Sequence, residues 1–255
     1  MLTKPKKDDL INQIFNESCI DTMKKIPDNF VDVVITSPPY NMNLRIRNGE
    51  YCSRQIVKEI STKYEDFPDN LPINDFYEFH SSVLKELLRI SNLVFYNIQI
   101  VTGSKRAFFK IIGEFSENLK DIIIWDKKYA QPAIGEQVLN RRSELILVFE
   151  NDYPISRQFR SATFKRGTLD DVWVIDRERT KTETHGATFP QKLISTIIEN
   201  FSNEGDIIYD PFLGTGTTAV VAKKFNRKYI GSEISKKYFK VCKDRLKKEV
   251  SLFTD

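Results

Sequence analysis

One stretch of the sequence limits the possible folds more than any other. Residues 206–225, DIIYDPFLGTGTTAVVAKKF, join a short apolar run, a turn with two glycines and a helical run. A glycine turn between a strand and a helix lets the backbone approach a ligand at the carboxyl edge of a parallel sheet. The spacing is neither G-x-G-x-x-G nor that of a phosphate-binding P-loop, since no Gly-Lys-Ser/Thr follows. We therefore predict an α/β fold with a ligand site at this turn.

Apolar runs of two kinds alternate along the rest of the chain. Runs rich in β-branched residues predict strands at 33–35, 92–98, 121–125, 144–150 and 228–234. Helical spacing predicts helices over 73–90, 189–202 and 235–250, with Asn74 or Asp75 capping the first and Ser235 the last. Strands that alternate with helices predict a doubly wound, mostly parallel sheet covered on both faces.

Two long segments, 41–72 and 151–188, interrupt this alternation, and both are basic. Such long connections in a compact domain are often functional or disordered. Taken alone, each basic segment is more often a solvated loop face. Their coincidence with the long connections favours contact with nucleic acid, where basic residues bind phosphate. The candidate DNA-contacting residues are Arg45, Arg47, Arg157, Arg160, Lys165 and Arg166.

The run VVI at 33–35 stops abruptly at Ser37, Pro38, Pro39 and Tyr40. The two prolines have no N–H to extend a sheet ladder, and they bias the preceding residue away from helical geometry. The result is a stiff corner that presents the serine, carbonyl oxygens and the tyrosine ring. A simple strand terminator with a surface aromatic explains the same pattern.

Several classes of protein are disfavoured. The three cysteines, Cys19, Cys52 and Cys242, form neither a zinc pattern nor a disulfide framework, which fits a reducing cytoplasm. Two histidines make a His-rich metal site improbable, and we expect no metal. The N-terminal MLTKPKKDDL is polar and charged, and no apolar run has membrane length. We therefore expect a cytoplasmic protein with no membrane partner.

The chain resembles the amino-methylating DNA methyltransferases, which use S-adenosylmethionine. TSPPY at 36–40 is similar to their catalytic motif, Asp/Asn/Ser-Pro-Pro-Tyr/Phe, and DPFLGTGTT at 210–218 to their Phe-x-Gly-x-Gly cofactor loop. The catalytic motif precedes the cofactor loop, which is the order of the β group. The resemblance implies one Rossmann-like catalytic domain over 1–255 of the class I methyltransferase type. It also implies a target-recognition insertion at 151–188 and a mobile DNA-contacting loop at 41–72.

The resemblance also implies roles for individual residues. Ser37, Pro38, Pro39 and Tyr40 would form the base pocket. The cofactor site would comprise Phe189, Pro190, Lys192, Asp210, Phe212, Gly214, Gly216, Thr217, Thr218 and Glu233. Ser18 stands where the family normally has an acid for the cofactor's adenine. Without the resemblance, Asp210 would be read as a turn cap and Phe212 as a core ring.

An exocyclic amine is a poor nucleophile, because its lone pair is delocalised into the base. Ser37 Oγ and the Pro38 carbonyl could accept its two N–H groups and direct the lone pair at the methyl donor. Tyr40 would stack on the base, which must leave the duplex to reach the pocket. A carbon-5 cytosine enzyme would need a nucleophilic cysteine, usually after proline, and no cysteine here follows one.

Serine before Pro-Pro, and HGATFP at 185–190, favour cytosine N4 over adenine N6 as the methylated atom. Adenine N6 stays the alternative. An inactive DNA-binding relative and an RNA or protein methyltransferase are the rivals from other classes. Arg141 and Arg142 either face DNA or pair with acids. The expected partner is double-stranded DNA, and the family leaves open a homodimer and a cognate restriction endonuclease.

Overall fold

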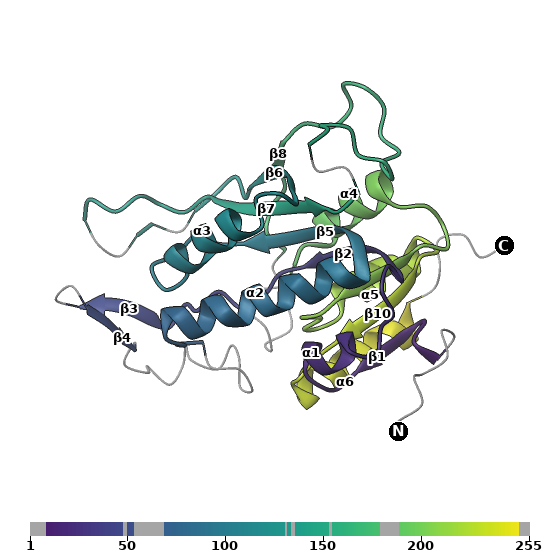
Figure 1. Cartoon of the computed structure of the whole chain (residues 1–255), viewed down its shortest axis with the longest axis horizontal. Coiled ribbons are helices and arrows are strands. Elements are labelled where there is room, and N and C mark those ends of the chain that lie inside the picture. Colours follow the sequence, from purple (N-terminus) through teal and green to yellow (C-terminus); the bar gives the residue numbers. More distant parts are fainter. Residues whose placement is uncertain are drawn as a thin grey trace.

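The computed structural model describes residues 9–47, 50–53, 69–130, 132–133, 136–152, 155–178 and 189–249, with the backbone alone at 45–47 and 50–53. Strands and helices alternate along most of this chain (Figure 1). In order they are β1 (Gln13–Phe15), α1 (Cys19–Met23), β2 (Val31–Thr36), β3 (Leu44–Arg47), β4 (Glu50–Ser53), α2 (Ile73–Ile90), β5 (Ser91–Ile98), α3 (Lys105–Glu114), β6 (Leu119–Asp126), β7 (Ser143–Glu150), β8 (Val172–Val174), α4 (Gln191–Phe201), β9 (Ile207–Asp210), α5 (Thr217–Lys224), β10 (Lys228–Ser232) and α6 (Lys236–Lys248).

Eight of these strands form one sheet in the order β1-β10-β9-β2-β5-β7-β6-β8. Only β7 runs against its neighbours, β5 and β6, and the other pairings are parallel. β2 lies in the middle, between β9 and β5, so the carboxyl ends of these three strands meet at one edge. The prediction of a mostly parallel α/β sheet is confirmed.

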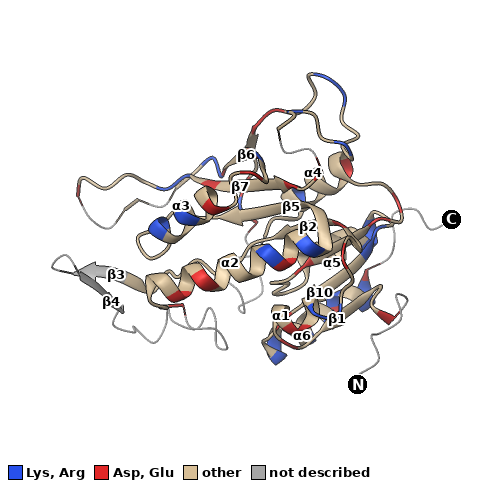
Figure 2. Cartoon of the chain, viewed as in Figure 1, with Lys and Arg blue, Asp and Glu red and all other residues tan. Residues whose placement is uncertain are grey.

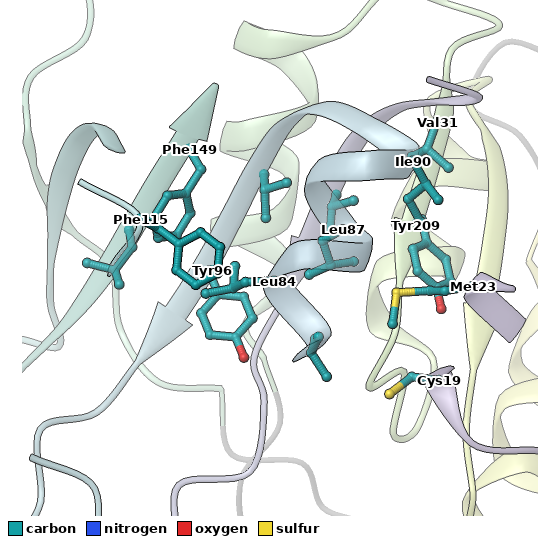
Figure 3. Packing of buried hydrophobic residues seen from close by; sticks show 14 of the residues in the cluster. Cys19, Met23, Val31, Leu84, Leu87, Ile90, Tyr96, Phe115, Phe149 and Tyr209 are labelled. Atoms are coloured by element: carbon teal, nitrogen blue, oxygen red, sulfur yellow. The ribbon is translucent and has the colours of Figure 1, made fainter. Parts of the chain in front are cut away.

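Alternate residues of the central strands face two hydrophobic layers, as the pleat of a strand requires. Val34 packs into the layer under α2 and α3, whereas Val33 and Ile35 pack into the layer under α4. Leu84 and Leu87 of α2 belong to the first layer and point toward the sheet (Figure 3). Because both faces are covered, the central strands are apolar almost throughout, which is why they appear as continuous runs in the sequence.

The structure also differs from the sequence predictions. The helix over 73–90 begins at Ile73 with Pro72 at its N-cap, and no side chain caps it, so the predicted cap at Asn74 or Asp75 is wrong. Both residues lie inside the first turn. Ser235 does stand at the N-cap of α6, but its side chain makes no capping hydrogen bond.

The two long basic segments contain structure of their own. An antiparallel hairpin, β3–β4, lies within 41–72, and β8 within 151–188 adds an edge strand parallel to β6. Parts of both segments, 48–49, 54–68, 153–154 and 179–188, lie outside the described residues. In the described part of the chain, no helix is long and apolar enough to cross a membrane.

Candidate active site

The two sequence motifs meet in space, although about 170 residues separate them. β2 pairs in parallel with β9, with Val33 opposite Ile208 and Val34 opposite Tyr209. This register brings the last residue of β2 beside the last residue of β9, and the Thr36 hydroxyl donates to Asp210 Oδ1 at 2.8 Å. The Ser-Pro-Pro-Tyr corner therefore starts next to the glycine turn.

Asp210 ties this junction together. Its carboxylate also accepts the Phe212 backbone N–H at 3.0 Å and the Thr218 hydroxyl at 2.7 Å. Burial raises the pKa of Asp210 to about 6, although the hydrogen bonds from Thr218, Thr36 and the Phe212 N–H oppose the shift. The side chain thus joins three segments inside the protein. The turn-capping role considered from the sequence corresponds to one of these contacts, the hydrogen bond from the Phe212 N–H.

The glycine turn needs its glycines. Gly214 and Gly216 have φ values of 55° and 88°, in the left-handed region that side chains rarely adopt. A Cβ on Gly216 would lie 2.3 Å from Cys242 Sγ of α6, so helix packing also excludes a larger residue. The turn leads directly into α5, where Thr217 and Thr218 are buried in the first helical turn.

Glu233 follows β10 and faces the same turn. Its Oε2 accepts the Gly214 N–H at 2.7 Å, and its Oε1 accepts the Ser235 N–H at 2.8 Å. The carboxylate therefore sits beside the glycine turn, at the carboxyl edge of the sheet, where the sequence predicts a ribose-binding acid. It is 9% exposed, so a bound ligand would reach it only at the rim.

The remaining predicted cofactor residues lie at the ends of neighbouring elements. Ser18 follows β1, the strand that pairs with β10, and its hydroxyl accepts the Ile20 N–H at the start of α1.

Three predicted residues lie at the start of α4. Phe189 packs against Trp125, with 6.5 Å between ring centroids. Pro190 is the N-cap of α4, and Lys192 is exposed in the first turn of this helix. Phe212 is half-buried, and its ring lies tilted against that of Phe79 with 6.0 Å between centroids, in keeping with a ring at the core boundary.

A hydrogen-bond network lies under the Ser-Pro-Pro-Tyr corner. The Ser37 and Tyr40 hydroxyls are 2.6 Å apart, and Tyr40 Oη lies 3.1 Å from Glu144 Oε2. Asn97 Nδ2 donates to Tyr40 Oη at 2.6 Å and to Glu144 Oε2 at 2.7 Å. Lys127 Nζ donates to Glu144 Oε1 at 3.0 Å, and this ion pair is buried.

Asn97, Lys127 and Glu144 were not predicted from the sequence. One signal was available, because each is a polar residue at the end of an apolar strand run, where burial is expected. Their convergence depends on strand pairing, since β7 runs antiparallel between β5 and β6 and sets Glu144 opposite Trp125.

A second buried polar pair supports the corner from the α2 side. His80 Nδ1 hydrogen-bonds the Tyr96 hydroxyl, and both side chains are fully buried. Burial lowers the pKa of His80 to about 3, so the ring is neutral at pH 7, and the Pro39 backbone acts in the opposite direction. His80 therefore packs as an uncharged ring behind the prolines.

The predicted DNA-contacting residues fall into three groups. Arg157, Arg160, Lys165 and Arg166 are exposed on the loop beyond β7, drawn with blue segments in Figure 2. Arg141 is also exposed, whereas Arg142 pairs with Asp126, the acid-pairing alternative for that residue. The side chains of Arg45 and Arg47 lie outside the described residues.

Aromatic residues hold this basic loop on the domain. Phe159 and Phe164 pack edge-on against Phe201 of α4, with centroids 5.2 Å and 5.4 Å away. The Thr163 N–H donates to the Asn200 carbonyl at 2.8 Å. The aromatic and basic residues that interleave in the sequence are thus separated in space, with the rings inward and the charges outward.

Comparisons with known proteins agree with this geometry. Residues 31–244 match the family model N6_N4_Mtase, described as DNA methylase. The type II methyltransferase M.HinfI of Haemophilus influenzae is 27% identical over 96% of this chain and 71% of its own length. Among solved structures, the cytosine-N4-specific PvuII DNA methyltransferase aligns with a TM-score of 0.70 and 14% identity over 95% of this chain and 88% of its own. The M1.HpyAVI–SAM complex aligns with a TM-score of 0.63 and 20% identity, over 92% of this chain and 98% of its own.

Proposed function

Because this chain belongs to the N6/N4 DNA methylase family, and to its β group by motif order, we propose that it methylates the N4 amino group of cytosine in duplex DNA, with S-adenosylmethionine as the methyl donor. The observation that carries the proposal is the hydrogen bond between Thr36 and Asp210. It places the residue before the Ser-Pro-Pro-Tyr corner on the carboxylate that organises the glycine turn. Amine and methyl donor can therefore be held side by side.

The chemistry of the site fits the proposed cofactor. S-adenosylmethionine supplies an electrophilic methyl group on a positively charged sulfonium. Two carboxylates, Asp210 and Glu233, lie at the glycine turn and favour a cation there. Glu233 is also placed for ribose hydroxyls, and Ser18 could hydrogen-bond the adenine. Phe189, Pro190 and Lys192, at the start of α4, would contact the methionine end.

Ser37 and Pro38 would activate the target amine. The Ser37 hydroxyl oxygen and the Pro38 carbonyl each accept one N–H of the amine, which directs its lone pair toward the methyl group. The two prolines hold that carbonyl in a fixed direction, so little reorganisation is needed during reaction.

The proposed methyl transfer requires neither a covalent intermediate nor a metal. Among the described residues, no cluster of three His, Cys, Asp or Glu side chains could hold one.

Tyr40 would stack on the base once the base has left the duplex. In the structure Tyr40 is 8% exposed and its hydroxyl is hydrogen-bonded. Stacking is therefore proposed for the DNA-bound state, in which a ring face must become accessible.

The choice of cytosine rests on sequence, namely the serine before Pro-Pro and HGATFP. Adenine N6 is the alternative, since both bases present the same planar amine. Target recognition is assigned to 151–188, and further DNA contacts to 41–72. A homodimer and a cognate endonuclease are proposed from the family resemblance, and a cytoplasmic location from the cysteine pattern.

Nucleoside mass spectrometry of duplex DNA incubated with the purified protein and S-adenosylmethionine tests the proposal. N4-methylcytosine is the expected product, and mapping of the modified positions would give the target site. N6-methyladenine would select the alternative. Cofactor and DNA binding without any methylated product would identify an inactive relative instead.

A further inference from the structure

The buried ion pair under the catalytic corner calls for an explanation. The Lys127 and Glu144 side chains are 0% and 10% exposed, and no sequence motif assigns them a role. Removing two charges from water costs free energy that their attraction only partly returns. Such a pair is a weak source of stability, which points to a role in holding neighbouring groups in place.

The hydrogen-bond donors in the network fix its direction. Asn97 Nδ2 is a donor only, and it already serves both Tyr40 Oη and Glu144 Oε2. The Tyr40 hydroxyl has one hydrogen to give, either to Glu144 or to Ser37. A carboxylate is the stronger acceptor, so the hydrogen goes to Glu144 at 3.1 Å. The 2.6 Å contact between Ser37 and Tyr40 must then use the hydrogen of Ser37.

We propose that Glu144, paired with Lys127, is a positioning residue that directs the chain Ser37 to Tyr40 to Glu144, so that Ser37 Oγ presents its lone pairs to the target amine. This inference rests on the proposed function, in which Ser37 is an acceptor for the amine. If the Ser37 hydrogen pointed at the substrate, the hydroxyl would present a donor to the amine N–H, which needs an acceptor. The Tyr40 hydroxyl thus has a role distinct from that of its ring.

The orientation of the Asn97 carboxamide is consistent with this direction of the chain. Its Nδ2 must face the Glu144 carboxylate, because two acceptors cannot bond each other. Its Oδ1 is then buried with no hydrogen-bond partner among the described residues. Buried unpaired acceptors are uncommon in native proteins, and here the cost accompanies an orientation that the chain of hydroxyls requires.

Tyr40→Phe is the decisive variant, because it removes the hydroxyl and keeps the ring. The family motif accepts phenylalanine at this position, so we expect the fold to be retained. We expect kcat to fall roughly 3- to 10-fold, the value of one directed hydrogen bond, with KM for DNA and cofactor affinity unchanged. A merely structural role would lower the melting temperature or cofactor affinity along with kcat.

A double-mutant cycle links Tyr40 to Glu144. Glu144→Gln replaces an obligate acceptor by a group that can also donate, so the direction of the chain is lost. If both residues act through one chain, Tyr40→Phe combined with Glu144→Gln should lose no more activity than the worse single variant. Independent effects would multiply.

The protein contains a matched control. On the outer helices, Tyr77 Oη donates to Glu114 Oε2 at 2.9 Å, and Lys85 pairs with Glu114 at 3.0 Å. Tyr77→Phe and Glu114→Gln repeat the same changes away from the site, and both should keep wild-type kcat.

The outcomes separate the two proposals. A wild-type protein that methylates DNA, with an unchanged kcat in Tyr40→Phe, would overturn the positioning role alone. Multiplicative losses in the double variant would do the same. A wild-type protein that methylates no DNA would overturn the proposed function itself, and the positioning role with it.

Discussion

Ser37 bears the proposed chemistry at the scale of single residues. Replacement by alanine removes one of the two acceptors for the amine but leaves the glycine turn intact. We expect Ser37→Ala to lose at least about 100-fold in kcat, in the range seen when one preorganised group at a reacting centre is deleted. Cofactor affinity, measured by calorimetry, should stay within about twofold.

Ser116→Ala is the control for this change, because Ser116 is an exposed serine at the end of α3. It should behave as wild type. Retained turnover in Ser37→Ala would remove Ser37 from the mechanism, even if DNA methylation itself were established.

Asp210 gives a pH prediction at the same scale. Its pKa is raised to about 6, so the carboxyl is neutral below that pH and charged above it. A positively charged methyl donor should therefore bind more tightly as pH rises through about 6. The gain is roughly tenfold if the bound cation lowers the pKa of Asp210 by one unit. Calorimetry between pH 5 and 8 measures the affinity for the methyl donor, and Asp210→Asn should abolish this rise in affinity with pH.

Residues inside the two motifs could be predicted from the sequence, because each motif is short and its members are neighbours in the chain. Lys127, Asn97 and Glu144 could not, since their meeting depends on β7 running antiparallel between β5 and β6. Arg142 illustrates the same limit. Its basic charge was visible, but its pairing with Asp126 across the β6–β7 ladder was not.

At the scale of elements, strong apolar periodicity predicted well and local turn chemistry did not. α2 has the predicted bounds, because its apolar stripe buries Phe76, Val83 and Leu87 completely. Only its capping residue was mispredicted, since Pro72 occupies the N-cap without any side-chain hydrogen bond. The helix α3 and the short strand β8 were not predicted. β8 has only three residues, and its pairing with β6 is non-local.

The loop held by Phe159 and Phe164 leads to a prediction about DNA. Its exposed arginines, Arg157 and Arg160, should contact phosphate or bases, so changing both to alanine should weaken duplex binding. The slope of log K against log salt should fall by up to about two, because each phosphate that an arginine neutralises contributes about one to the slope. Fluorescence anisotropy over a salt series measures the slope.

Two exposed lysines of α6, Lys240 and Lys247, provide a charge-matched control. Changing both to alanine removes the same net charge from a helix that packs on α5, and the salt slope should stay the same. An equal drop in both double variants would mean that general charge, and not this loop, governs binding.

At the scale of the whole molecule, two buried groups in different places oppose each other as pH falls. His80 has its pKa lowered to about 3, so between pH 6.5 and 3 the unfolded state binds more protons and acid destabilises the fold. Asp210 has its pKa raised from 3.8 to about 6, so between those values the folded state binds more protons and acid stabilises it. Their contributions therefore offset between about pH 4 and 6.

Removing either titrating group should reveal the pH dependence of stability that the other contributes. In Asp210→Asn the free energy of unfolding, relative to wild type, should fall by about 1 kcal/mol per pH unit on acidification from 6 to 4. The second variant combines His80→Leu with Tyr96→Phe, so that no tyrosine hydroxyl is left without a partner. Its free energy of unfolding, relative to wild type, should rise by a similar amount over the same pH range. Urea unfolding at pH 7, 6, 5 and 4 measures both, and parallel curves for all three proteins would show that neither group titrates as its burial implies.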